Sequence, residues 1–217
     1  MIFDKNKSMD KKTERLIDII RDAKSKYSEE NLVLVIPKFM SKSFTSFCSI
    51  REDLLLIKKY LEKLEIEKDV IISSALTYSL ISIYGKCFTD ATKSKSPKLE
   101  PKQIYEEGSN FLMTHDYLMD LRHNFIAHRG DTENEVEAAY LLIPKEEGEP
   151  QVRYAQKKRM NLNSEKRNEI SELVEFLLPI VMDKIQKSGQ KTYNALFDNF
   201  TPEQMSFMLI NNVKDEK

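Results

Sequence analysis

The chain has 217 residues, of which 41% are hydrophobic and 32% are charged, and its formal net charge at pH 7 is −1. This composition excludes wholesale disorder, and the near-neutral total excludes the global basic field that many nucleic-acid-binding proteins carry. With only five glycines and seven prolines, the sequence favours long helices over many short strands.

Hydrophobic periodicity predicts helices in the first third of the chain. Residues 8–27 place isoleucines and a leucine among charges at helical spacing, and residues 49–67 do the same with lysines opposite. Residues 31–39, between them, leave two alternatives open. Their β-branched run suggests a strand, whereas Pro37 and the short length suit a buried helical turn equally well.

A more apolar helix is predicted next. Residues 69–90 are apolar almost all round, which is typical of a central helix packed on several sides. Residues 91–102 are polar and predict an exposed loop. Helical periodicity resumes at about Ser109 and stops at Gly130, where glycine suits a helix C-terminus and Arg129 complements the helix dipole.

The last third of the chain combines a predicted hairpin with further helices. Two β-prone runs on either side of "EEGEP" predict a two-stranded hairpin. Residues 163–188 return to helical periodicity, with Asn163 or Ser164 as N-cap and a kink expected at Pro179. A capping box then opens a final helix, with Thr201 as N-cap, Pro202 at the first position and Gln204 at the third.

These elements predict a mainly α protein, a helical bundle with an inserted β-hairpin. We expect a single domain over residues 1–217. Its expected parts are the N-terminal helices (1–66), the central helix pair (67–130), the β-hairpin (136–162) and the C-terminal helices (163–217).

The cysteines and the terminus bear on location. Cys48 and Cys87 have no spacing typical of a disulfide framework or a zinc site. The N-terminus lacks the apolar segment of a signal peptide, and no uninterrupted apolar run approaches the ~20 residues of a membrane helix. We therefore expect a reduced, cytoplasmic protein that does not bind membranes.

Histidine is concentrated in one short stretch. "LRHNFIAHRGD" (residues 121–131) holds His123 and His128, two of the three histidines in the chain, and His115 lies just upstream. On an α-helix Arg122 and His128 would lie about 120° apart and ~9 Å along the axis, so they are not a hydrogen-bonded pair but can flank one cleft. A zinc site built from the three histidines is disfavoured, because they point in different directions on a helix.

Imidazole and guanidinium together suit chemistry at phosphate. A histidine with a pKa near ~6.5 can move a proton at neutral pH, and an arginine can stabilise the charge that develops on a phosphate. In RNA the 2′-hydroxyl supplies the nucleophile. These two groups are therefore the minimum for cleaving a phosphodiester without a metal or another cofactor.

The string from Arg122 to His128 resembles the R-x(4–6)-H motif of the HEPN superfamily, and "DLRHNFIAHRGD" is similar to strings in HEPN proteins of abortive-infection and toxin systems. The resemblance implies a helical bundle that dimerises, so that two motifs form one composite cleft. It also implies metal-independent endoribonuclease activity, although some members only bind nucleotides.

By that resemblance Arg122 would stabilise the phosphate and His128 would be the acid–base residue, with His123 or Asn124 as the accompanying polar group. RNA would be the substrate, a second copy the expected partner, and an antitoxin or another defence protein a further partner.

Three other residues are candidates for substrate binding. Arg129 adjoins the motif, and Tyr84 and Lys86 on the predicted central helix could reach the cleft and touch phosphate. The default interpretation of Tyr84, together with Tyr78, is a buried aromatic pair.

Two other functional hypotheses stay open. The first is a non-catalytic HEPN-like scaffold for a nucleotide, RNA or protein, which the near-neutral charge favours. The second is a purely structural helical protein, in which His128 is a core histidine and Arg122 pairs with Asp120 or another carboxylate.

Overall fold

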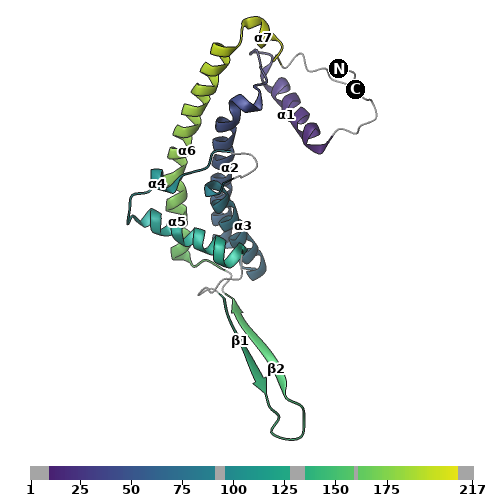
Figure 1. The fold of residues 1–217 in the computed structure, drawn as a ribbon, viewed down its shortest axis with the longest axis vertical. Coiled ribbons are helices and arrows are strands. Elements are labelled where there is room, and N and C mark those ends of the chain that lie inside the picture. Colours follow the sequence, from purple (N-terminus) through teal and green to yellow (C-terminus); the bar gives the residue numbers. More distant parts are fainter. Residues whose placement is uncertain (1–9, 91–95, 128–134, 159–160, 210–217) are drawn as a thin grey trace. The chain divides into compact units, whose positions relative to one another are not determined.

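Long helices account for most of the chain, and one antiparallel pair of strands interrupts them (Figure 1). The computed structural model describes residues 10–90, 96–127, 135–158 and 161–209. The prediction of a mainly α protein with an inserted β-hairpin is therefore confirmed. In chain order the elements are α1 (Lys11–Tyr27), α2 (Lys38–Ile66), α3 (Val70–Phe88), α4 (Pro101–Ile104), α5 (Asn110–Asp120), the π-helix η1 (Leu121–Ala127), β1 (Glu135–Leu142), β2 (Gln151–Lys158), α6 (Ser164–Asn199) and α7 (Pro202–Ser206).

The chain divides into two units. The larger unit spans Ser43–Lys187, and the smaller one combines Met1–Lys42 with Ser188–Lys217. The larger unit contains the hydrophobic core, the hairpin and the "LRHN" part of the histidine-rich stretch.

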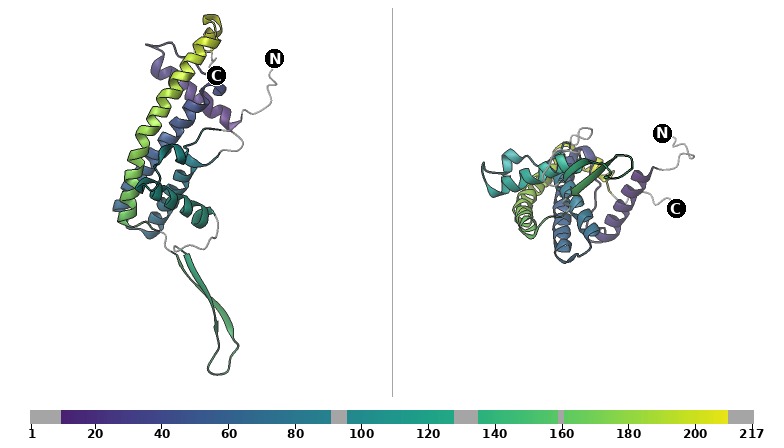
Figure 2. Two further views of the ribbon diagram at one scale, coloured as in Figure 1. Left: turned by 60° about the vertical axis from the view of Figure 1, so that its left-hand side comes forward. Right: turned by 90° about the horizontal axis from the view of Figure 1, so that it is seen from below.

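The core of the larger unit is built around α3, as the apolar sequence of this helix predicts. Nine of its residues are buried, among them Leu80, Ile81 and Tyr84. α5 stacks Phe111 on Phe176 of α6 near its start, and at its other end it continues into η1 beside α3 (Figure 2). The largest of the almost fully buried side chains come from four helices and one connector: Leu54, Ile57, Leu80, Ile81, Tyr84, Leu99, Leu118, Ile170, Leu173, Val174 and Leu177.

Among the described residues, α3 alone is long and apolar enough to cross a membrane by length and composition. Such a helix is equally the usual core helix of a helical bundle. The contacts of Leu80, Ile81 and Tyr84 with the rest of the core give α3 that role in the larger unit.

Helix boundaries follow the capping signals of the sequence. Asp69 accepts hydrogen bonds from the backbone N–H groups of Ile71 and Ile72 and so caps α3. Asn163, one of the two expected caps, accepts from Lys166 N at the start of α6. The capping box of Thr201 and Gln204 is confirmed, with both of its hydrogen bonds present.

In the smaller unit, residues 31–39 form neither alternative fully. Leu34 makes an isolated antiparallel bridge with Leu209, and Val35 N donates to Met208 O at 2.8 Å. α2 then begins at Lys38, directly after Pro37, because proline fixes φ at a helical value and its missing N–H costs nothing at a helix start. The helix predicted from residue 49 therefore begins eleven residues earlier.

The prediction that residues 91–102 form an exposed loop is wrong for their second half. Leu99 is completely buried, its N–H donates to Cys87 O at 2.9 Å, and α4 begins at Pro101. A single leucine among polar residues gives no periodic signal, yet it fills a place in the core.

The hairpin has eight paired residues on each strand, from Glu135 opposite Lys158 to Leu142 opposite Gln151. Within the strands the side chains from Val136 to Leu142 and from Gln151 to Lys157 are all exposed. The predicted range of 136–162 thus contains both strands except for the first residue of β1.

Candidate functional site

Arg122 lies at the second position of η1, and its side chain runs across α3. A Cβ atom placed on Gly85 would lie 1.8 Å from Arg122 Cδ and 2.4 Å from Arg122 Nε, far inside contact distance. The buried Gly85 therefore leaves the space in which the arginine side chain rests. The half-buried Arg122 is held by this close approach rather than extended into solvent.

A surface pocket of about 380 Å³ opens beside Arg122. Two cationic side chains line it, Arg122 and Lys86, together with two carboxylates, Asp53 and Asp90. The other lining residues supply four hydroxyl groups and two apolar surfaces: Ser46, Ser49, Ile50, Thr89, Ser96 and Pro97.

The carboxylates offset part of the positive charge in this pocket. Lys86 Nζ lies 2.8 and 3.1 Å from the two carboxylate oxygens of Asp53, whose side chain is only 15% exposed. Asp90 pairs with Lys98 at 3.1 Å. Arg122, the other cation that lines the pocket, takes part in neither of these two ion pairs.

The π-helix changes the geometry expected for the motif. A π-helix makes i→i+5 hydrogen bonds, so each residue turns by less than the ~100° of an α-helix. The α-helical turn assumed for residues 121–127 was therefore wrong, and His128, to which the predicted angle refers, lies outside the described residues. His123 and Asn124 are both exposed, and Asn124 Nδ2 donates to Asp120 Oδ1 at 2.6 Å.

Two predicted site residues, His128 of the motif and the adjoining Arg129, lie outside the described residues, as does the expected helix stop at Gly130. The structure brings Arg122 and Lys86 together at one pocket. Tyr84 lies in the core with no exposed surface and does not line this pocket, so the prediction that it touches phosphate there is wrong.

Tyr84 belongs to a buried cluster that includes the third histidine. Its hydroxyl lies 2.7 Å from Nδ1 of His115 and 3.2 Å from the hydroxyl of Tyr105. Phe88 packs against the His115 ring with centroids 4.4 Å apart. Burial raises the pKa of Tyr84 and of Tyr105 far above their ordinary value, so both remain protonated.

The same burial lowers the pKa of His115, and the charge of Asp116 only partly opposes this. In the neutral tautomer with its proton on Nε2, His115 accepts the Tyr84 hydrogen bond through Nδ1. His115 is therefore a core residue, whereas His123 is exposed.

Metal ligands do not gather in the described parts of the chain. No group of three histidine, cysteine, aspartate or glutamate side chains there could hold a metal ion. Cys48 and Cys87 are free thiols, and burial raises the pKa of Cys87 to about 12.

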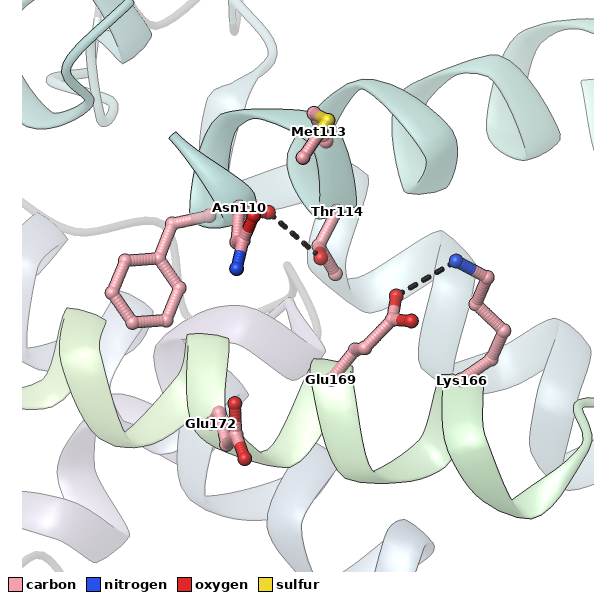
Figure 3. Close-up of a pocket in the computed structure, with 7 residues that line it drawn as sticks. Asn110, Met113, Thr114, Lys166, Glu169 and Glu172 are labelled. Atoms are coloured by element: carbon pink, nitrogen blue, oxygen red, sulfur yellow. Dashed lines mark hydrogen bonds and ion pairs between the residues drawn. The ribbon is translucent and has the colours of Figure 1, made fainter. Parts of the chain in front are cut away.

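A second pocket, of about 280 Å³, lies between α5 and α6 (Figure 3). Asn110 and Thr114 approach it from α5, and Lys166, Glu169 and Glu172 from α6. Lys166 and Glu169 form an ion pair at 2.7 Å, and Thr114 Oγ1 donates to Asn110 O. Its polar groups are thus largely engaged with one another.

The Arg122 pocket is the better candidate for chemistry on an anion. A guanidinium can bind phosphate through two parallel N–H bonds, and the serine hydroxyls of Ser46 and Ser49 can donate further bonds, whereas the Thr89 hydroxyl donates to Gly85 O. Sequence reasoning missed Gly85 and Asp53. A signal for Gly85 was present, since an isolated glycine in an apolar helix costs about 1 kcal/mol and usually has a packing reason.

Comparison of the whole chain with models of known protein families, with curated proteins and with solved structures found no match.

Proposed function

We propose that this protein is a metal-independent endoribonuclease of HEPN type that cleaves single-stranded RNA at a site containing Arg122 and His128. The observation that carries the proposal is the position of Arg122, which rests on Gly85 at the edge of an open pocket lined by hydroxyl groups. A guanidinium held in place before substrate arrives stabilises developing phosphate charge without reorganisation.

In the proposed reaction the ribose 2′-hydroxyl attacks the adjacent phosphorus and loses its proton to a histidine. The bond from phosphorus to the 5′-oxygen breaks, and that oxygen receives a proton from an acid. The products are a 2′,3′-cyclic phosphate and a free 5′-hydroxyl. Arg122 binds the nonbridging oxygens, which carry most negative charge in the transition state.

His128 is the proposed acid–base residue, and Asn124 and His123 are the polar residues beside the phosphate. Both are exposed on η1, the element that carries Arg122. We further propose that two copies of the chain pair their η1 segments, so that one histidine accepts the proton and the other donates one. Phage defence or a toxin–antitoxin pair is the proposed biological setting.

The test is incubation of total RNA with the wild type, Arg122→Ala and His128→Ala in the presence of EDTA. We expect cleavage by the wild type alone, with 2′,3′-cyclic phosphate ends. Arg15→Ala, which removes an exposed arginine on α1, is the matched control and should cleave normally. Equal cleavage by all variants, or loss of wild-type activity on adding EDTA, would rule the proposal out.

A non-catalytic scaffold that binds a nucleotide, RNA or protein is the second candidate. The observation in its favour is the balance of charge at the pocket, where Asp53 and Asp90 accompany Lys86 and Arg122. A scaffold predicts that wild type and His128→Ala bind RNA equally and that neither cuts it.

A further inference from the structure

One face of the hairpin carries positive charges only. Side chains alternate between the two faces of a strand, and directly paired residues of an antiparallel ladder share a face. One face therefore carries Tyr140 opposite Arg153 and Val136 opposite Lys157. The eight residues of this face, which we call the basic face, are Val136, Ala138, Tyr140, Leu142, Gln151, Arg153, Ala155 and Lys157.

No carboxylate occurs among the eight residues of the basic face, although the chain as a whole is slightly acidic. The opposite face carries Glu137, to which the hydroxyl of Tyr154 donates. One face of the hairpin therefore has two cations and no carboxylate, which suits a surface that binds an anionic polymer.

The basic face also contains an aromatic side chain directly opposite one of its two cations. Tyr140 is directly opposite Arg153, and its side chain is 48% exposed. Lys157 is four residues beyond Arg153 on the same strand, so their Cα atoms are about 13 Å apart. Arg153 donates one hydrogen bond to Gln151, which leaves further guanidinium donors for a ligand.

An isolated two-stranded hairpin is marginally stable in water, because it has no third layer on which to bury apolar side chains. This hairpin nonetheless exposes Val136, Tyr140, Leu141, Leu142, Val152 and Tyr154. A partner that covers one face therefore stabilises the hairpin as well as binding to it.

We propose that the basic face of the hairpin binds single-stranded RNA, with a base stacked on Tyr140 and phosphates on Arg153 and Lys157. Single strands suit this combination because their unpaired bases can stack on an aromatic ring while cations track the backbone. Two cations and an exposed ring on one face, with no carboxylate, match the phosphates and bases of a single strand. This surface is separate from Arg122, and binding can be measured whether or not the protein cuts RNA.

The test measures binding of the full chain to a fluorescent 20-nucleotide oligouridine with 2′-O-methyl groups, which cannot be cleaved through its 2′-oxygens. Arg153→Ala/Lys157→Ala should lower the slope of log K against log salt concentration by about 1.4, from two lost contacts with single-stranded phosphates. Tyr140→Ala should weaken binding by about 5- to 100-fold through lost stacking, with the slope unchanged.

Matched controls lie elsewhere on the chain. Lys11→Ala/Lys12→Ala removes two exposed cations of α1, and Tyr154→Ala removes the tyrosine of the opposite face. Both should bind as the wild type does. The proposal is overturned if the basic-face variants bind like the wild type or lose no more than these controls. It is also overturned if they change the oligomeric state while RNA affinity stays constant, since the face is then an interface between copies.

Discussion

At the scale of single residues, the close approach of Arg122 to Gly85 predicts whether Gly85→Ala stabilises or destabilises the folded protein. In an exposed helix, replacing glycine by alanine stabilises by about 1 kcal/mol. Here the new methyl group would overlap Arg122 Cδ, so Gly85→Ala should destabilise the wild type. In an Arg122→Ala background the overlap disappears, and the same substitution should stabilise.

Urea unfolding of the four proteins in this double-mutant cycle measures the coupling directly, and we expect about 0.5–3 kcal/mol, the range for residues in contact. Gly85→Ala should also reduce RNA cleavage, because the guanidinium is displaced from the pocket. Additive effects in the cycle would mean that Arg122 does not rest on Gly85.

The buried His115 makes a second prediction, for pH. Its pKa in the folded protein lies below the unfolded value because burial disfavours the charged ring. Between these two pKa values the unfolded state binds more protons than the folded state, so lowering the pH favours unfolding. The stability that the neutral His115 contributes is therefore complete above about pH 6.5 and declines as the pH falls toward its pKa in the folded protein.

Chemical denaturation between pH 7.5 and 5.5 tests this. The wild type should lose stability as the pH falls, and His115→Gln should be less stable overall but lose less over that interval. His123→Gln, which changes an exposed histidine, should retain the wild-type slope. A steep slope that survives in His115→Gln would assign the effect to another group.

At the scale of elements, the caps decide where helices begin. Asp69 accepts two backbone hydrogen bonds at the start of α3, the helix at the centre of the core. Asp69→Ala should therefore cost about 1 kcal/mol, whereas Asp69→Ser, which can still cap, should cost less. Thermal melts of the two variants make the comparison, and equal losses would contradict a capping role.

Elements with a repeating signal could be predicted from the sequence, and single contacts could not. α1, α3 and α6 follow helical periodicity, and the hairpin follows its two β-prone runs. The π-turn of η1 was missed because a hydrogen-bond register leaves no mark in apolar spacing. Leu99 was missed because it is one apolar residue in a polar run, and its burial depends on a tertiary contact with the end of α3.

The candidate site shows the same division. Local composition led to Arg122, and Lys86 was expected to reach the same cleft. Gly85 and Asp53 carry no motif, and their relation to Arg122 exists only after α2, α3 and η1 have packed. Tyr84 is buried, as its default interpretation predicted. Its hydrogen-bond partners are Tyr105 and His115, which the sequence did not indicate.

At the scale of the whole molecule, the proposed site requires two copies. If acid and base come from different protomers, specific activity should fall on dilution through the dimer dissociation constant, in step with the dimer fraction from sedimentation velocity. Constant specific activity from a monomer would show that one chain supplies the whole site.

The central claim is that Arg122 stabilises the transition state of RNA cleavage. Its most direct test compares the rates at which the wild type and Arg122→Ala cleave one defined single-stranded RNA in EDTA, after thermal melts have shown that the two proteins have the same melting temperature. We predict that the variant is slower by a factor of about 10²–10³, the usual effect of removing a group that stabilises transition-state charge. Equal rates, or no cleavage by the wild type, would contradict the claim.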